Sequence, residues 1–187
     1  MNQLTTVALM LNLAGAGIYA QQRPVKMTFS GTGGPSTINL QHPSTNNSED
    51  NSAGSGTLGA FTFRNVRAIR ATPEPSSACS GPTKLYFSSV AGAGVFRFQD
   101  GSLLNVKLTE AGDCIDLAAL QAQCTMTFQI TGGTGRFKDA SGVLTLTEAV
   151  LPVLADASSN PVLFAATGEF TGTIAGPAIG EDRQDER

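Results

Sequence analysis

The sequence is poor in the residues that carry most side-chain chemistry. It has one histidine, His42, among 187 residues, and charged residues make up only 14% of the chain. A Ser/His/Asp triad or a site with several histidine ligands therefore finds no support, because His42 stands alone in a polar segment without periodicity. Three cysteines and one histidine are also poor material for a zinc site. The residues predict no metal centre.

The sequence also lacks a charge excess and a long apolar run beyond its first 20 residues. The formal net charge is −3 and the isoelectric point is near 5.1. A protein that binds nucleic acid or an anionic membrane usually carries a basic patch, and none is visible here. We therefore expect no nucleic-acid partner and no membrane span.

Residues 1–20 contain no charged side chain and carry an apolar run from Val7 to Leu13. The run ends in small residues before a polar stretch, which predicts a secretory signal peptide cleaved after Ala20. A membrane anchor is the weaker alternative, because the run is short and Asn12 interrupts it. We expect a secreted protein, extracellular or periplasmic, with one domain over residues 21–180 and a flexible charged tail over 181–187.

What the sequence has in abundance is glycine, with 21 residues, and two-residue alternation of apolar and polar side chains. This pattern is typical of half-buried antiparallel strands. The polar stretch 41–56 is expected to be a surface loop, and 91–94 a bulge or a tight turn. About eight strands predict an all-β fold, an eight-stranded antiparallel barrel or, as the alternative, a two-sheet sandwich. The expected strands are 25–30, 57–69, 84–90, 95–98, 103–115, 124–130, 142–150 and 163–174.

One glycine-rich loop joins the two most cleanly alternating segments. Gly132, Gly133 and Gly135 predict backbone angles that a side chain would forbid. Phe137, which follows them, can fold back over the end of the sheet. The loop is therefore interpreted as architectural.

The segment Gly132-Gly133-Thr134-Gly135-Arg136-Phe137, followed by Ala140-Ser141-Gly142, resembles a motif of the allene oxide cyclase and dirigent-like barrel superfamily. The resemblance covers roughly residues 124–176 and suggests a bacterial-type secreted member. It implies an eight-stranded barrel, often trimeric, whose lumen binds an apolar or aromatic molecule. Plant members cyclise an unsaturated fatty-acid epoxide or orient phenoxy radicals, without a metal or organic cofactor. The motif transfers a fold and no catalytic residue.

The three cysteines predict a disulfide in an oxidising compartment. An antiparallel hairpin centred on residue 119 places Cys114 opposite Cys124, and the same register pairs Leu108 with Ile130. We therefore expect a Cys114–Cys124 bond. The alternative joins Cys79 to one of these two cysteines.

Some polar side chains fall on faces that ought to be apolar, and they are the candidate ligand-binding residues. Arg67 shares a face with Phe61 and Phe63, and Glu110 follows Leu104, Val106 and Leu108 in step. Tyr86 and Arg97 lie in the expected strands 84–90 and 95–98 and are candidates as well. The alternative for each is a position at the barrel rim, where a long side chain reaches solvent.

Glu148 is the strongest candidate, because alternation aligns it with Leu144, Leu146 and Val150. Inside a barrel its carboxyl would be protonated or paired, with Arg67 the expected partner. The alternatives are a position at the rim or an outward face covered by a neighbouring subunit.

Three functions fit this sequence. The first is a secreted barrel that binds a small apolar ligand, the second is a cofactor-free cyclase or isomerase, and the third is a structural protein with a packed barrel.

Overall fold

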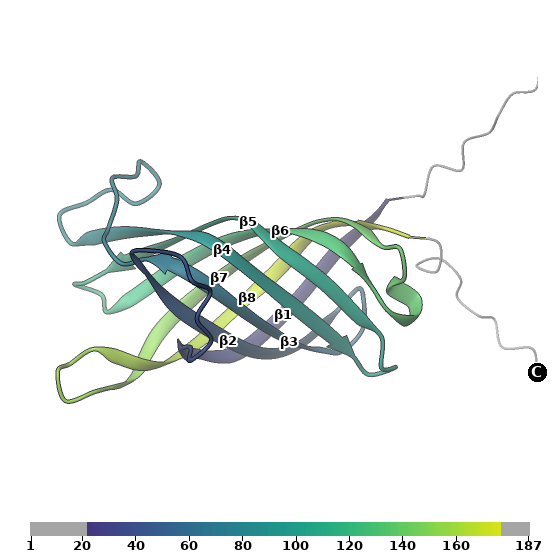
Figure 1. The fold of residues 1–187 in the computed structure, drawn as a ribbon, viewed down its shortest axis with the longest axis horizontal. Coiled ribbons are helices and arrows are strands. Elements are labelled where there is room, and N and C mark those ends of the chain that lie inside the picture. The colour runs from purple at the N-terminus through teal and green to yellow at the C-terminus, as the bar shows by residue number, and fades with distance from the viewer. Residues whose placement is uncertain (1–21, 177–187) are drawn as a thin grey trace, which may run out of the picture.

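A computed structural model describes residues 22–176 as a single closed barrel of eight antiparallel strands. Each strand pairs with the next along the chain, and β1 pairs with β8 to close the cylinder (Figure 1). The predicted all-β barrel is confirmed, and the two-sheet alternative is wrong because no sheet edge is left unpaired. The strands are β1 (Arg23–Pro35), β2 (Thr45–Gly56), β3 (Phe61–Arg70), β4 (Lys84–Phe98), β5 (Leu103–Asp116), β6 (Gln121–Gly133), β7 (Ser141–Ala155) and β8 (Pro161–Ala175).

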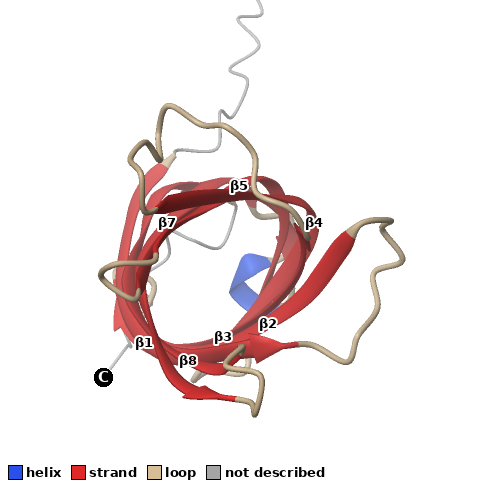
Figure 2. Ribbon diagram, turned by 90° about the vertical axis from the view of Figure 1, so that its left-hand side faces the viewer, coloured by secondary structure: helices blue, strands red, loops and turns tan. Residues whose placement is uncertain are grey.

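The two ends of the barrel differ. One end, here called the closed end, has the turns 57–60 and 99–102 and the segment 134–140. The other, here called the open end, has the four connections 36–44, 71–83, 117–120 and 156–160. Figure 2 looks along the barrel from the open end and shows the short helix η1 at the far end.

Phenylalanine side chains fill the lumen towards the closed end. Phe96 and Phe170 are fully buried, and their ring centroids lie 4.9 Å apart. Phe63 stacks on Phe96 at 4.2 Å and meets Phe170 edge-on at 5.1 Å. Such ring pairs add about 0.5–1.5 kcal/mol each beyond the area they bury. This cluster is the core of the barrel.

The predicted loop 41–56 is wrong over most of its length, because residues 45–56 form β2. Its inward positions carry only small or polar side chains, and Gly54 shows why. A Cβ on Gly54 would lie 2.9 Å from the Cα and the Cβ of Phe29. Phe29 is the partner of Gly54 in the β1–β2 ladder, so a large side chain on β2 would collide with its neighbour strand, and β2 shows no apolar alternation.

The strands predicted separately over 84–90 and 95–98 are one strand, β4. Ala68 pairs with Ala91 and Ile69 with Ser89, so Val90 is an extra residue in the ladder. The predicted bulge is therefore present beside the Ala91–Gly94 segment, and the alternative of a tight turn is wrong.

The glycine-rich loop closes one end of the barrel as predicted. Phe137 lies in η1 (Gly135–Phe137), is 1% exposed, and its ring centroid lies 4.6 Å from that of Phe98. The predicted backbone angles are present at Gly135, with φ +58°, and at Gly132, with φ +113°. The prediction is wrong for Gly133, which has no positive φ and is needed instead because a Cβ there would lie 2.1 Å from the Leu103 carbonyl oxygen. Arg136 then donates a hydrogen bond to the Leu58 carbonyl oxygen, 2.5 Å away, and ties the loop to the neighbouring turn.

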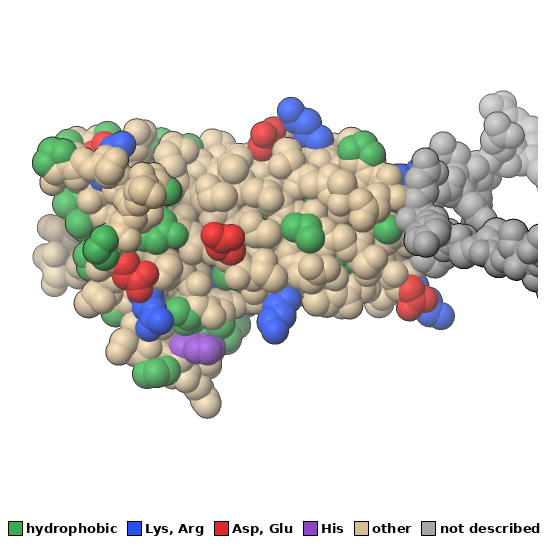
Figure 3. All heavy atoms as spheres, turned by 90° about the horizontal axis from the view of Figure 1, so that it is seen from above, with side chains coloured by type: hydrophobic (Ala, Val, Ile, Leu, Met, Phe, Trp, Pro, Cys, Tyr) green, Lys and Arg blue, Asp and Glu red, His purple; other side chains and the backbone are tan. Residues whose placement is uncertain are grey.

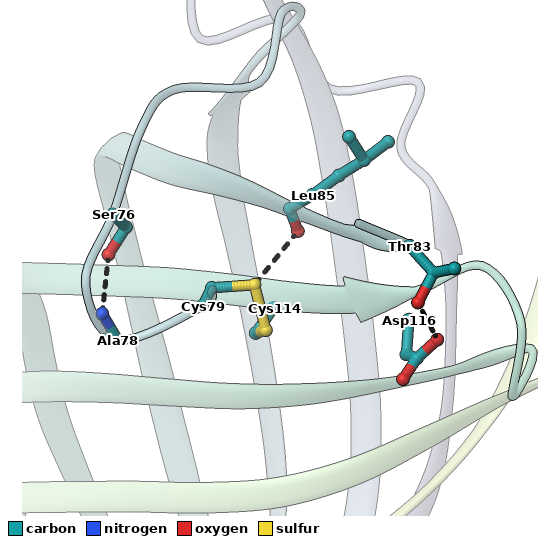
Figure 4. The surroundings of a disulfide bond; sticks show 7 residues. All are labelled: Ser76, Ala78, Cys79, Thr83, Leu85, Cys114 and Asp116. Atoms are coloured by element: carbon teal, nitrogen blue, oxygen red, sulfur yellow. Dashed lines mark hydrogen bonds between the residues drawn. A yellow bond between two sulfur atoms is a disulfide. The ribbon is translucent and has the colours of Figure 1, made fainter. Parts of the chain in front are cut away.

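The predicted Cys114–Cys124 disulfide is wrong, and Cys79 bonds to Cys114 instead (Figure 4). Leu108 pairs with Phe128 but Glu110 pairs with Thr127, so Thr109 is an extra residue that shifts the register. Asp113 therefore pairs with Cys124, while Cys114 pairs with Gln123 and faces outward. Cys124 faces the lumen as a free thiol. The disulfide fastens the 71–83 connection to the outside of β5.

The predicted signal peptide over 1–20 and charged tail over 181–187 lie outside the described residues, and so do the two ends of the domain predicted over 21–180. Within 22–176, no helix is long and apolar enough to cross a bilayer.

Candidate functional site

A cavity of about 210 Å³ occupies the lumen towards the open end. Asn46 and Arg70, both exposed, lie in its lining and show that it reaches solvent. Apolar side chains come from five strands and form part of its wall: Ile69, Phe87, Ile115, Val150 and Phe164. The volume is below the roughly 300–1,000 Å³ of pockets for drug-sized ligands, so the cavity suits a smaller molecule.

Four charged side chains point into this cavity from four different strands. They are Asp50 of β2, Arg67 of β3, Asp113 of β5 and Glu148 of β7. Arg67, Asp113 and Glu148 are each 6% exposed, which is rare for charged residues unless they are paired. The lumen thus holds three carboxyl groups and one guanidinium.

Arg67 is bound mainly to one of these carboxylates. Its Nη1 donates to Asp113 Oδ1 at 2.7 Å and to Oδ2 at 2.8 Å. Its Nε lies 3.6 Å from Asp50 Oδ2, an ion pair too long for a hydrogen bond. Burial alone would lower the pKa of Arg67, but Asp113 and Asp50 outweigh it and raise the pKa, so Arg67 is always charged. The predicted Arg67–Glu148 pair is therefore replaced by Arg67–Asp113.

Glu148 lies in the lumen, as its alternation predicts, but has no hydrogen bond to another residue of 22–176. Burial, and then the nearby charge of Asp50, raise the pKa of Glu148 from 4.5 to about 8, although Arg67 acts in the opposite direction. Its carboxyl is therefore mostly protonated at neutral pH and can donate a hydrogen bond. Burial also raises the pKa of Asp50 above its usual value.

Glycines opposite two of the acidic residues provide the space for them. Gly33 pairs with Asp50, and a Cβ there would lie 2.2 Å from Asp50 Oδ1. Gly168 pairs with Glu148, and a Cβ there would lie 2.8 Å from the Glu148 Cβ. A larger residue at either position would displace the acidic side chain, so these glycines belong to the site.

Cys124 lines the same cavity. It lies directly opposite Glu148 in the antiparallel pairing of β6 with β7. It is 4% exposed, and burial raises its pKa well above the usual range. Cys124 is therefore a thiol and not a reactive thiolate at neutral pH.

The remaining predicted site residues lie on the outside of the barrel. Glu110 is exposed, because the extra residue Thr109 reverses the facing that alternation predicted. The ring of Tyr86 packs over Gly112, where a Cβ would lie 2.2 Å from the Tyr86 hydroxyl. Arg97 is exposed and lines an outer groove of about 640 Å³ over β1 to β4. None of the three lines the lumenal cavity.

Sequence reasoning missed Asp50, Asn65 and Asp113. Asp50 was hidden because its strand carries no apolar alternation. Asp113 was hidden because the shift at Thr109 moves it from the predicted outer face to the lumen. Asn65 alone carried a usable signal, since it falls on the same face as Phe61, Phe63 and Arg67 and is 3% exposed.

Among residues 22–176, no group of three or more His, Cys, Asp and Glu side chains is arranged to hold a metal ion. The three lumenal carboxyl groups are instead spread around Arg67. The cluster can bind a polar group of an organic ligand or hold a proton close to one.

Comparison with known proteins adds little. No family model and no curated protein sequence matches the chain. Among solved structures, a pterocarpan synthase dirigent protein aligns over 90% of this chain and 99% of its own, with 10% sequence identity and a TM-score of 0.36. Membership of the dirigent-like superfamily stays a prediction, whereas the barrel follows from the strand pairing itself.

Proposed function

We propose that this protein binds a small, largely apolar ligand in the lumen at the open end of its barrel. The observation that carries the proposal is the joint lining of the cavity, with apolar walls and the unpartnered carboxyl of Glu148. Apolar walls supply affinity, and a few polar groups set the orientation of a ligand. A structural protein with a packed barrel would not need an open cavity of about 210 Å³.

The surface around the cavity supports an apolar ligand. Figure 3 shows hydrophobic side chains gathered at the open end, on the left of that view. Large apolar residues at the tips of the β5–β6 and β7–β8 hairpins are more than half exposed: Leu117, Leu120, Leu151, Val153 and Leu154. An apolar molecule would meet a compatible surface before it enters the cavity.

A cavity-filling variant tests this proposal. Ala166 faces the lumen and lines the cavity, whereas its neighbour Ala165 does not line it. We expect Ala166→Leu to weaken binding of benzyl alcohol, measured by calorimetry, by about tenfold or more, and Ala165→Leu to leave it unchanged. Native mass spectrometry of protein extracted from its source should show a bound small molecule. Equal binding by both variants would place the ligand outside the lumen and contradict the proposal.

A second candidate function is a cofactor-free cyclase or isomerase. One observation favours it: Glu148 holds a proton near neutral pH inside the cavity, as a general acid must. Incubation with an unsaturated fatty-acid epoxide tests it, with product formation expected for the wild type and lost in Glu148→Gln. Absence of turnover by protein that binds benzyl alcohol would leave ligand binding alone.

We further propose that the chain is exported, as its first 20 residues predict. The Cys79–Cys114 disulfide supports this, because such bonds persist mainly in oxidising compartments. Extraction from the source should give the disulfide-bonded chain beginning at Gln21, detected by intact mass.

A further inference from the structure

The inner end of the cavity has more hydrogen-bond acceptors than donors. A pocket of about 10 Å³, room for about one water molecule, is lined by Asp50, Asn65 and Glu148 and shares Ala166 with the larger cavity. Asp50 Oδ2 and Asn65 Oδ1 are buried and accept no hydrogen bond from another residue of 22–176. The carboxyl of Glu148 has no hydrogen bond there either.

The charges around this small pocket are also unbalanced. Arg67 is the one buried cation of the cavity among the described residues, and both hydrogen bonds from its Nη1 go to Asp113. Arg70 also lines the cavity, but it lies exposed at the rim, where it pairs with Glu74 at 3.4 Å. Arg67 Nε, itself buried without a hydrogen-bond partner, forms only a 3.6 Å ion pair with Asp50 Oδ2, and no cation of the described residues pairs with Glu148.

We propose that the lumen selects a primary amine with an apolar tail, whose ammonium group lies between Asp50, Asn65 and Glu148. This inference rests on the proposed function and names the chemical class of its ligand. An ammonium has three donors and no acceptor, which matches Asp50 Oδ2, Asn65 Oδ1 and the carboxyl of Glu148 once that carboxyl has lost its proton. The tail would pack against Ile69, Val150 and Phe164 in the larger cavity. An alcohol brings one donor and no charge, and a carboxylate would be repelled by the acidic groups.

Binding of an amine in this place releases a proton. Before binding, Glu148 carries its proton at neutral pH. A neighbouring ammonium favours the ionised form of Glu148, so the carboxyl becomes a carboxylate and its proton passes to solvent. The titratable and charged groups that face Glu148 are Asp50 of β2, Arg67 of β3, Asp113 of β5 and Cys124 of β6. The residues that β1, β4 and β8 contribute to the lining do not titrate: Gly33, Phe87, Phe164 and Ala166. Affinity should therefore fall as the pH falls below 8.

Three probes of equal length test the inference: n-hexylamine, 1-hexanol and hexanoate. We expect titration calorimetry at pH 7.5 to show hexylamine binding at least about tenfold more tightly than hexanol, and hexanoate most weakly. Titrations in two buffers of different ionisation enthalpy should report about one proton released per hexylamine. Between pH 7.5 and 6.5, hexylamine affinity should fall by up to about tenfold while hexanol affinity stays constant.

Substitutions test whether the amine selectivity and the proton release arise at the pocket lined by Asp50, Asn65 and Glu148. Glu148→Gln should abolish proton release and weaken hexylamine binding about tenfold or more, a larger loss than for hexanol, because the substitution removes the charge and keeps polar atoms at the site. The control Glu110→Gln removes the same kind of side chain from the outer surface and should change neither. Asp50→Asn, a second nearly isosteric change, should weaken hexylamine binding and provides the test if Glu148→Gln does not fold.

Two results would contradict the inference in different ways. If hexanol and benzyl alcohol bind as tightly as hexylamine and no proton is released, amine selectivity is wrong and ligand binding in the lumen stands. If hexylamine, hexanol and benzyl alcohol all fail to bind, the proposed function fails as well.

Discussion

The buried carboxyl of Glu148 makes folding pH-dependent. Its pKa is raised from 4.5 to about 8 in the folded chain. Below pH 4.5 both states hold the proton, so no penalty arises. Between pH 4.5 and 8 the unfolded state loses the proton first, and the folded state is destabilised by about 1.4 kcal/mol per pH unit. We expect Glu148→Gln to match the wild type near pH 4 and to be more stable by a few kcal/mol, on that slope, at pH 8.

Urea unfolding at a series of pH values measures this difference. Glu110→Gln serves as the control, since its exposed carboxyl on the outside of β5 lies away from the cavity. A stability difference between Glu148→Gln and the wild type that does not change from pH 4 to pH 8 would show that Glu148 is not held in its protonated form.

Arg67 balances part of the negative charge of the lumenal acids, so its removal should lower the free energy of unfolding. Arg67→Met would leave Asp113 buried without its two hydrogen bonds and Asp50 without its ion pair. Breaking such a buried pair from one side costs about 3–5 kcal/mol. Arg64 lies on the same strand as Arg67 and forms an exposed ion pair with Glu49 of β2, so Arg64→Met should cost only about 0–1 kcal/mol. Similar losses in the two variants, by urea unfolding, would contradict the buried cluster.

At the scale of the strands, alternation predicted six of the eight correctly and failed where the physical cause of alternation is absent. Strand β2 lies against Phe29 of the neighbouring strand β1 and uses small residues such as Gly54 there, so no apolar signal marks it. The count of eight still agreed, because β4 was divided into two expected strands. The shift at Thr109 is likewise not visible in the sequence, because a bulge changes the facing without changing composition.

The register shift at Thr109 also determines which cysteines can form a disulfide. It turns Cys114 outward to Cys79 and leaves Cys124 in the lumen. The sequence separation of 35 residues gives a chain-entropy stabilisation of about 3.8 kcal/mol. We expect Cys79→Ser to lower the free energy of unfolding by up to this amount, in urea. Peptide mapping should find the Cys79–Cys114 link, and one thiol should react only after unfolding; a Cys114–Cys124 link would show the predicted register instead.

Across the whole molecule, the lumen is divided between packing and chemistry. The phenylalanine cluster and Phe137 fill the closed end, whereas the charged cluster and the cavity occupy the open end. The sequence allowed the closed end and Glu148 to be predicted, because apolar alternation and glycine-rich turns leave local signals. The rest of the charged cluster depends on strand pairing between residues far apart, such as Arg67 and Asp113, which no local pattern specifies.

This division predicts that stability and binding can be changed separately with one kind of substitution. Phe170 is fully buried among other rings, so Phe170→Ala should cost about 3–5 kcal/mol in urea unfolding. Phe164 is half-buried and lines the cavity, so Phe164→Ala should cost less than half of that. Benzyl alcohol binding, measured where both variants are folded, should weaken about tenfold in Phe164→Ala and stay unchanged in Phe170→Ala. The opposite assignment, with binding lost in folded Phe170→Ala and kept in Phe164→Ala, would move the ligand site to the closed end.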